Sequence, residues 1–266
     1  MQTSTYKDMM GRWVAIPNIP KRIVSLVPSQ TELLFDLGLD EEVVGITKFC
    51  EHPIAWRKQK TIVGGTKKVD YTLIDQLAPD LIIANKEENT KEMIAALETK
   101  YPVWISDVNT KIDNELMIEQ IGAIVQKPER ALLIISKIQQ TFSKLKCLSS
   151  NLNIAYFIWK DPWMVAASHT FIHEMLVENE WVNVFEHKER YPIVSMEEVK
   201  AAQPDVIFLS SEPYPFKDKH IAELASELPN AKIILVDGTY FSWYGSRMQD
   251  AATYFEELHQ AMYYAQ

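Results

Sequence analysis

The segment Cys50-Glu51-His52 is the sharpest candidate for metal chemistry in this sequence. A thiolate and an imidazole are ligands that suit zinc, cobalt or iron. Two ligands two residues apart do not complete a tetrahedral site, so a further ligand would have to come from Glu87, His169 or His173. The alternative is a loop cysteine beside a histidine that is hydrogen-bonded to backbone.

The pair His169 and His173 is spaced so that both side chains could share one face of a helix. Zinc enzymes use this spacing in the HExxH motif, where a glutamate follows the first histidine. That glutamate is missing here. The pair therefore indicates capping or surface histidines rather than a second metal site.

Aromatic and polar residues gather in segments that follow predicted strands, where a binding site of an α/β protein is expected. A flat macrocycle suits such a lining, because aromatic rings offer a large apolar area at low entropy cost and an arginine can meet a carboxylate, amide or phosphate. The alternative for each aromatic residue is that it closes a hydrophobic core. The candidate ligand-binding residues are Pro28, Ser29, Phe49, Cys50, His52, Thr66, Lys67, Glu87, Asn89, Trp159, Trp163, Tyr214, Phe216, Tyr240, Trp243, Tyr244 and Arg247, with Gln30, Lys86 and Glu88 beside them.

Alternating strands and helices must position the first of these residues. The runs Arg22–Leu26, Val43–Thr47, Leu81–Ala84 and Val103–Ser106 predict strands, and helical segments lie between them. This alternation indicates βαβ units and a parallel sheet.

The centre of the chain is helical instead, first at Asn114–Val125 and then at Pro128–Lys146. Proline at the first helical position and Glu129 after it mark the start of the second helix. At 1.5 Å per residue this helix would be about 30 Å long, roughly the width of a small domain. Its apolar stripe consists of Ala131, Ile135, Ile138, Phe142 and Leu145.

A second α/β block follows and repeats a phrase of the first. Leu73–Asn85 and Met196–Ser210 both read as helix, Pro-Asp, buried strand, with Pro79 and Pro204 in corresponding places. We therefore predict two similar α/β lobes with mostly parallel sheets. The expected limits are residues 1–110 for the first lobe, 111–150 for a helical linker that contains the spine helix 128–146, and 151–266 for the second lobe.

Composition excludes several classes of function. The formal net charge of −9 disfavours nucleic acid and anionic membranes as partners. No stretch of about 18 apolar residues predicts a transmembrane helix, and the polar N-terminus lacks the apolar core of about 7–15 residues that a secretion signal needs. Only Cys50 and Cys147 are present, which excludes a disulfide framework. We see no nucleophile elbow, no P-loop and no GxGxxG after a strand, so the motifs do not favour an enzyme. We expect a soluble protein and a monomer.

The opening DMMGRWVAIPNIPKRIVSLVPSQTELLFDLG resembles the start of the substrate-binding proteins of ABC importers for vitamin B12, ferric siderophores and haem, and most resembles the vitamin B12-binding proteins. The resemblance continues through VVGITKFCEHP, QLAPDLIIANKEEN, SMEEVKAAQPDVIFL and LVDGTYFSWYGSRMQDAA and covers most of the chain. It implies two Rossmann-like lobes, a ligand in the cleft between them, and one long helix that restricts closure to a small amplitude. The implied function is non-catalytic capture of cobalamin or another corrinoid, a ferric siderophore or haem, without a required cofactor.

The resemblance also implies docking to an ABC permease. In this family a surface glutamate on each lobe pairs with arginines of the permease. Glu197 is similar to the glutamate of the second lobe, whereas Thr72 falls at the position of the first, so Asp70 or Asp75 would substitute. The alternative for Glu197 is a solvated helix N-terminus, which the helix dipole favours.

Ligand and compartment stay open at this level. Thr66 stands near the place of a tryptophan that vitamin B12-binding proteins carry, and Lys67 and Lys68 beside it favour an anionic ligand unless they are merely exposed. The family is periplasmic or extracytoplasmic, with a leader upstream of a segment like Tyr6–Gly11. No signal peptide is evident here, so the alternatives are a leader that was removed and a cytoplasmic relative.

Two other hypotheses remain. One is a cytoplasmic metal- or tetrapyrrole-handling protein, or an enzyme, that uses Cys50 and His52 on the same fold. The other is a two-lobed sensor or chaperone that acts on a soluble partner.

Overall fold

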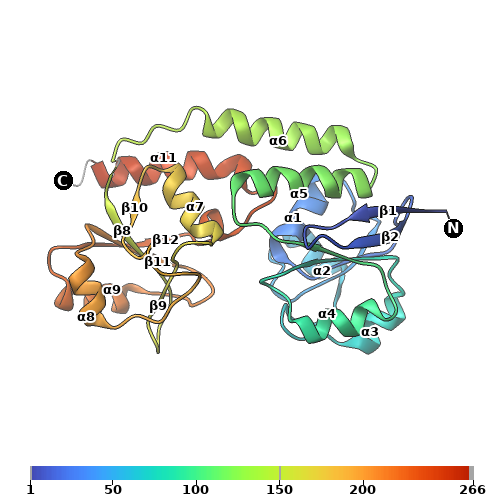
Figure 1. Cartoon of the computed structure of the whole chain (residues 1–266), viewed down its shortest axis with the longest axis horizontal. Helices are drawn as coiled ribbons and strands as arrows, with labels where there is room; N and C mark the ends of the chain where they lie inside the picture. The colour runs from blue at the N-terminus through green and yellow to red at the C-terminus, as the bar shows by residue number, and fades with distance from the viewer. Residues whose placement is uncertain (1, 150, 264–266) are drawn as a thin grey trace. The chain divides into compact units, whose positions relative to one another are not determined.

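The computed structural model describes residues 2–149 and 151–263, which form two compact units (Figure 1). Unit 1 comprises Met1–Val108, Ile112–Gln139 and Tyr244–Gln249, and unit 2 comprises Asn109–Lys111, Gln140–Trp243 and Asp250–Gln266. The chain therefore re-enters unit 1 near its end. The limits 1–110, 111–150 and 151–266 stay a prediction about domains.

Unit 1 is built on a parallel sheet, as the alternation of elements predicted. β6 is buried at every position, in keeping with an apolar run that is covered on both faces. In sheet order the strands are β5 (Thr61–Ile62), β4 (Val43–Ile46), β3 (Ile23–Ser25), β6 (Leu81–Asn85) and β7 (Val103–Ser106), with parallel neighbours throughout.

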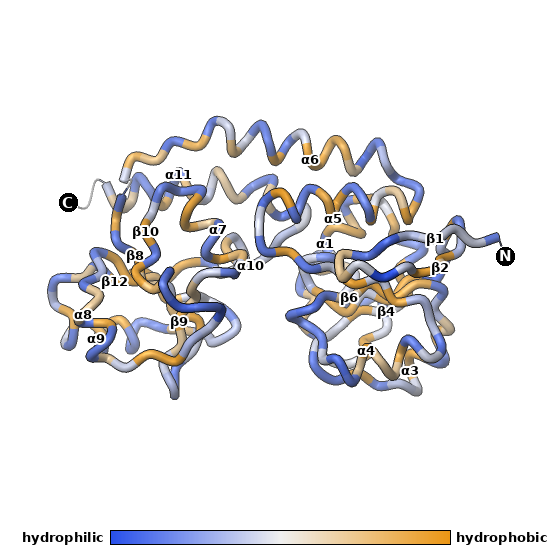
Figure 2. The backbone as a smooth tube through the Cα atoms, in the orientation of Figure 1, coloured by the Kyte–Doolittle hydropathy of each residue, from blue (hydrophilic) through white to orange (hydrophobic). Residues whose placement is uncertain are grey.

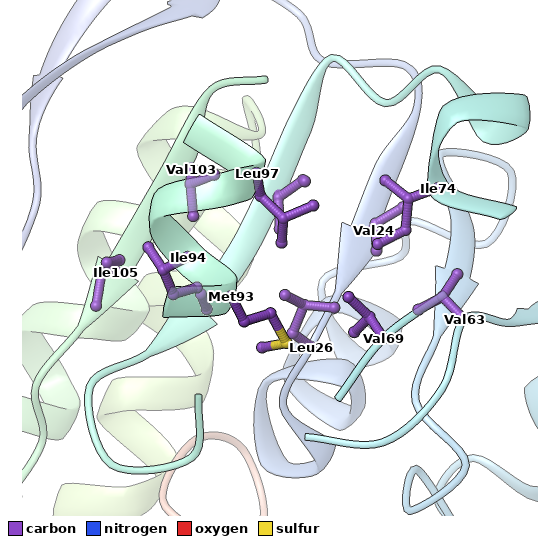
Figure 3. Close-up of a cluster of buried hydrophobic side chains, with 12 residues drawn as sticks. Val24, Leu26, Val63, Val69, Ile74, Met93, Ile94, Leu97, Val103 and Ile105 are labelled. Atoms are coloured by element: carbon purple, nitrogen blue, oxygen red, sulfur yellow. The ribbon is translucent and has the colours of Figure 1, made fainter. Parts of the chain in front are cut away.

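Helices cover both faces of this sheet. On one face α3 (Tyr71–Leu77) and α4 (Lys91–Glu98) pack on a buried apolar cluster, in which Met93 reaches toward Leu26 and Ile74 lies beside Val24 (Figure 3). The opposite face is covered by α1 (Pro28–Asp36) and α5 (Lys111–Ile124). A short helix, α2 (Ile54–Gln59), follows β4.

An N-terminal hairpin was missing from the sequence prediction. β1 (Thr3–Lys7) pairs antiparallel with β2 (Trp13–Pro17). Asp8 holds the turn, since its Oδ1 accepts hydrogen bonds from the backbone N–H groups of Met10 at 3.0 Å and Arg12 at 2.8 Å. The polar sequence of β1 hid the hairpin.

Unit 2 is also a mostly parallel sheet, so the predicted fold class is confirmed. One face packs against α8 (Met196–Ala202) and α9 (Asp218–Glu227). Aromatic side chains cover the other face together with α7 (Phe171–Glu178), α10 (Thr239–Ser242) and α11 (Met248–Tyr263). In sheet order the strands are β10 (Val182–Asn183), β8 (Asn153–Trp159), β11 (Val206–Ser210) and β12 (Lys232–Val236), and β9 (Met164–Val165) lies antiparallel to β8.

The two units repeat the predicted helix, Pro-Asp, strand phrase in detail. The helices α3 and α8 end at Ala78 and Gln203, which have φ angles of 43° and 47° in the left-handed region. The next aspartate ties the following strand to its neighbour: Asp80 accepts from the backbone N–H of Arg22 at 2.8 Å, and Asp205 accepts from that of Asn153 at 2.8 Å.

The central helix α6 (Pro128–Phe142) is shorter than predicted. The prediction that it reaches Lys146 is wrong, because the chain tightens into three-residue turns, with the N–H of Lys144 on the carbonyl of Thr141 and that of Leu145 on the carbonyl of Phe142. Its 15 residues span about 22 Å. Hydrophobic and hydrophilic positions alternate along it (Figure 2).

Within residues 2–149 and 151–263, every helix is too short or too polar to span a lipid bilayer.

Candidate functional site

The candidate residues of unit 1 gather at one edge of its sheet, because the segments that follow parallel strands leave from the same side. Asn89 fastens these segments together: its Nδ2 donates to the carbonyl of Thr66 at 2.9 Å, and its Oδ1 accepts from the N–H of Asn85 at 2.8 Å. Ser29 is buried in the first turn of α1, directly after Pro28. These residues shape the edge.

Glu88 lies in the turn that follows β6 at this edge. It is half-buried, and burial raises its pKa, while the charge of Lys67 and a hydrogen bond from the Thr66 hydroxyl act in the opposite direction. Its charge also contributes to raising the pKa of Cys50 and of Tyr244. Glu88 thus faces side chains from several segments that are distant in sequence.

Lys67 is already engaged within the protein. Its Nζ donates to the carbonyl oxygen of Glu87. A second lysine, Lys48, has its Nζ 4.9 Å from the ring centroid of Phe49. Phe49 itself is 50% exposed. The predicted preference of Lys67 for an anionic ligand therefore competes with contacts that it makes inside unit 1.

Cys50 is completely buried, with its Sγ 3.1 Å from Thr31 Oγ1 and 3.2 Å from Thr47 Oγ1. Burial raises the pKa of this thiol, which disfavours the thiolate that binds metals. His52 is half-buried, and its charge acts on Glu32.

Across the described parts of the chain, no three His, Cys, Asp or Glu side chains come together as a metal site would require. Within unit 1, Glu87 therefore does not supply the further ligand that Cys50 and His52 would need. His169 is exposed, and the backbone N–H of His173 donates to the Thr170 hydroxyl at 3.1 Å. The geometry gives the metal hypothesis no support.

Arg247 and Tyr244 lie in the segment that returns to unit 1. The Arg247 Nε and Nη2 atoms donate to the two carboxylate oxygens of Glu32 at 2.9 and 2.7 Å, a bidentate pair. Tyr244 is buried, and its hydroxyl lies near the side chains of Ser106, Ser29 and Gln30 at the edge. Sequence reasoning missed Glu32, because this ion pair joins residues 215 positions apart.

In unit 2 the aromatic candidates form one cluster at the ends of β8 and β11. Trp163 stacks on Phe216 with ring centroids 6.2 Å apart and planes 3° apart, and Phe216 belongs to the core. Tyr214 lies 4.7 Å from Phe216, and Trp159 meets Tyr214 edge-on at 5.5 Å. Trp159 remains 40% exposed. Exposure therefore increases across the cluster, from Phe216 in the core to the exposed ring of Trp159.

His220 was missed by the sequence reasoning, although it packs edge-on against the rings of Tyr214 and Phe216. Burial lowers the pKa of its imidazole, which favours the neutral ring. Its position on α9, away from the loops, hid it.

Tyr240 and Trp243 make contacts inside unit 2. Tyr240 stacks on Tyr254 with centroids 4.5 Å apart. Trp243 is 8% exposed, and its Nε1 donates to Glu212 Oε1 at 2.8 Å.

The candidate docking residues lie at the starts of two equivalent helices. Glu197 is exposed in the first turn of α8, after the Ser195 cap, and hydrogen bonds from its own backbone N–H and from Ser195 lower its pKa. Asp70 caps α3 by accepting from the N–H groups of Thr72 at 2.9 Å and Leu73 at 3.2 Å. Asp75, the other first-unit candidate, pairs with Lys100 at 2.7 Å.

Comparison with known proteins gives matches in sequence and in fold. The sequence model of the family described as periplasmic binding protein matches residues 23–230. The vitamin B12-binding protein of Vibrio cholerae is 30% identical over 203 residues, which cover 74% of this chain and 73% of that protein. The uncharacterized ABC transporter substrate-binding lipoprotein YvrC of Bacillus subtilis is 27% identical over 183 residues, 65% of this chain and 58% of that protein.

The periplasmic haem-binding protein RhuT of Roseiflexus sp. RS-1 has a similar structure, with a TM-score of 0.79 at 22% identity over 92% of this chain and 98% of that chain. This likeness concerns the fold. Together, the matches confirm the resemblance that the sequence motifs indicated.

Proposed function

Because the chain belongs to the periplasmic binding protein family, we propose that it captures a metal chelate and delivers it to an ABC importer. The family consists of solute-binding proteins that do no chemistry on their ligand. The proposed ligand is a corrinoid such as cobalamin, with haem and ferric siderophores as the other members of the class. A corrinoid comes first because the relative from Vibrio cholerae is named for vitamin B12.

The observation that carries this proposal is the exposed ring of Trp159 at the end of β8. Water contact with so large an apolar surface is unfavourable, and the ring is held edge-on by Tyr214 rather than folded into the core. A flat conjugated ring system would cover it. We propose that Trp159, Trp163 and Tyr214 contact the macrocycle, and that Phe216, Tyr240 and Trp243 support them from inside unit 2.

In unit 1 we propose that the exposed or half-buried side chains of Phe49, His52, Lys67 and Glu87 meet the ligand. The buried candidates hold this edge in shape through the contacts described above. The buried ones are Ser29, Cys50, Thr66, Asn89 and Tyr244, and the half-buried Pro28 and Arg247 act with them.

The proposed partner is an ABC permease, in line with the naming of the Bacillus subtilis relative. Glu197 is the proposed docking residue of unit 2 because it is an exposed carboxylate. Asp70 is the counterpart in unit 1, where it also caps α3. We further propose that the protein is monomeric, requires no cofactor and acts outside the cytoplasm, as its family does.

Ligand binding is tested by titrating the purified protein with cyanocobalamin, dicyanocobinamide, haemin and ferrichrome, followed by absorbance and tryptophan fluorescence. We expect saturable binding of at least one chelate. Trp159→Ala should weaken it about tenfold, which is about 1.4 kcal/mol, because a stacking surface is removed. The matched control is Trp13→Ala, whose ring on β2 is 70% exposed and should leave the affinity unchanged.

Absence of binding by all four chelates at about tens of micromolar would contradict the proposal. An equal loss in both tryptophan variants would instead contradict the role of Trp159. No observation favours a metal-handling enzyme built on Cys50 and His52, so we put forward no second function.

A further inference from the structure

One short segment of the chain, Tyr244–Gln249, belongs to unit 1, although the residues before and after it belong to unit 2. We call this segment the strap. Asn114 of α5 holds it at two points: its Oδ1 accepts from the backbone N–H of Gly245 at 2.6 Å, and its Nδ2 lies 3.0 Å from the sulfur of Met248. Asn114 and Met248 are completely buried, so these contacts are shielded from water.

The helix α1 holds the strap as well. Gly245 has a φ angle of +94°, in the region that favours glycine, and a Cβ at this position would lie 3.2 Å from the carbonyl oxygen of Ser29. Three residues further along α1, the carboxylate of Glu32 accepts two hydrogen bonds from Arg247, at 2.9 and 2.7 Å. The strap backbone therefore lies close against the first turn of α1, and a pair of side chains fixes it there.

The Glu32–Arg247 pair is shielded from solvent, since the two side chains are only 17% and 11% exposed. Both carboxylate oxygens and two guanidinium nitrogens take part, and this bidentate geometry fixes orientation as well as distance. Removing one partner of such a pair leaves the other charge in a poorly hydrated place, which is costly. A shift of the strap along α1 would break the pair, so the pair favours a single register.

The register of the strap decides where Tyr244 lies. Tyr244 directly precedes Gly245, and its buried hydroxyl lies near the side chains of Ser29 and Ser106. Ser29 follows β3 and Ser106 ends β7, so both belong to the edge of the sheet that carries the candidate residues of unit 1. The strap thus brings a residue from near the end of the chain into this edge.

We propose that Glu32 is a positioning residue of the ligand edge, which holds the strap in register through Arg247 and so keeps Tyr244 in place. This inference rests on the proposed function, because it gives Glu32 a part in the binding of the chelate. A pair that only stabilised the fold would, when broken, loosen all of unit 1 alike. A positioning pair predicts a local effect, on the strap and on ligand affinity.

The test compares Glu32→Gln with the wild-type protein by hydrogen–deuterium exchange and by titration with cyanocobalamin, dicyanocobinamide, haemin and ferrichrome. We expect the amides of the strap to exchange about tenfold faster in the variant, while the slowest amides of β6 keep their wild-type rates. The chelate that the wild-type protein binds should be bound about tenfold more weakly, because the strap must then be ordered on binding. Glu42→Gln is the matched control. It breaks a pair with Lys21 at 3.7 Å, also in unit 1, and should change neither the exchange of the strap nor the affinity.

A double variant, Glu32→Gln with Arg247→Gln, keeps the test decisive if Glu32→Gln alone folds poorly. It removes both charges, so neither is left buried without its partner. We expect its urea midpoint to lie closer to that of the wild-type protein. Its strap should still exchange fast and its affinity should still be reduced, because the register is no longer fixed.

Unchanged exchange of the strap in both variants would overturn the inference. So would a rise of the same size in β6, which is the result of a structural role alone, or wild-type affinity in a variant whose strap exchanges fast. In these three cases the wild-type protein still binds its chelate, and the proposed function stands. If none of the four chelates binds to the wild-type protein, the proposed function falls, and the role of Glu32 in ligand binding falls with it.

Discussion

His259 shows how one buried side chain can couple stability to pH. It is completely buried on α11, where its Nδ1 lies 2.9 Å from Ser149 Oγ and its Nε2 lies 3.1 Å from Asn179 Oδ1. A neutral ring with its proton on Nε2 donates to Asn179 and accepts from Ser149, so both contacts are satisfied without charge. Burial lowers the pKa of His259 to about 4, from an ordinary value of 6.5.

This residue predicts a loss of stability in mild acid. The unfolded chain takes up a proton near pH 6.5 and the folded chain only near pH 4, so the stabilisation is fully present above pH 6.5 and is lost as the pH falls between these values. Its upper bound is about 3 kcal/mol. Urea unfolding at several pH values should show this slope in the wild-type protein.

His259→Gln is expected to flatten that slope while also lowering stability at pH 7. The control is His187→Gln, at an exposed position, which should keep the wild-type slope. An unchanged slope in His259→Gln would contradict the assignment.

At the scale of elements, the repeated helix, Pro-Asp, strand pattern has the same strained backbone conformation at the end of its helix in each unit. α3 and α8 both end in a left-handed residue that is not glycine, namely Ala78 and Gln203. A side chain in this conformation costs about 1–2 kcal/mol, because its Cβ approaches a carbonyl oxygen. Proline follows at once and prevents the helix from continuing.

Replacing Ala78 or Gln203 by glycine should therefore stabilise the protein by about 0.5–1 kcal/mol each, after allowing for the greater entropy of glycine in the unfolded chain. Thermal or urea unfolding measures the effect. Ala95→Gly, at an exposed position inside α4, is the control and should destabilise by about 1 kcal/mol. A loss of stability in both cap variants would contradict the assigned strain.

At the scale of the whole molecule, α6 is the element in which the boundary between the units falls, between Gln139 and Gln140. Its interior contains neither proline nor glycine. A helix without such a break resists sharp bending. The shorter length of α6 leaves this property in place, so the expectation of small-amplitude closure stays a prediction.

Small-angle X-ray scattering should give superimposable profiles with and without saturating cyanocobalamin. Ser136→Pro, at an exposed position in the middle of α6, should break the helix and allow the profiles to diverge, whereas Ser136→Ala should behave as wild type. A large change in the wild-type radius of gyration on binding would contradict a stiff α6.

Local patterns in the sequence were enough to predict the parallel α/β fold, the repeated helix, Pro-Asp, strand phrase and the family. These features depend on residues that are close together in the sequence, so hydrophobic periodicity and turn residues are enough to predict them. The end of α6 at Phe142 escaped prediction, because the apolar stripe continues to Leu145 while the backbone bonds do not. Only the tertiary structure decided which candidate side chains are committed to the fold. Arg247 forms an ion pair with Glu32, and the buried Cys50 Sγ contacts the hydroxyls of Thr31 and Thr47. Glu88 interacts with Lys67 and Thr66, which lie in another segment. These partners are far apart in the chain, and only folding brings them together.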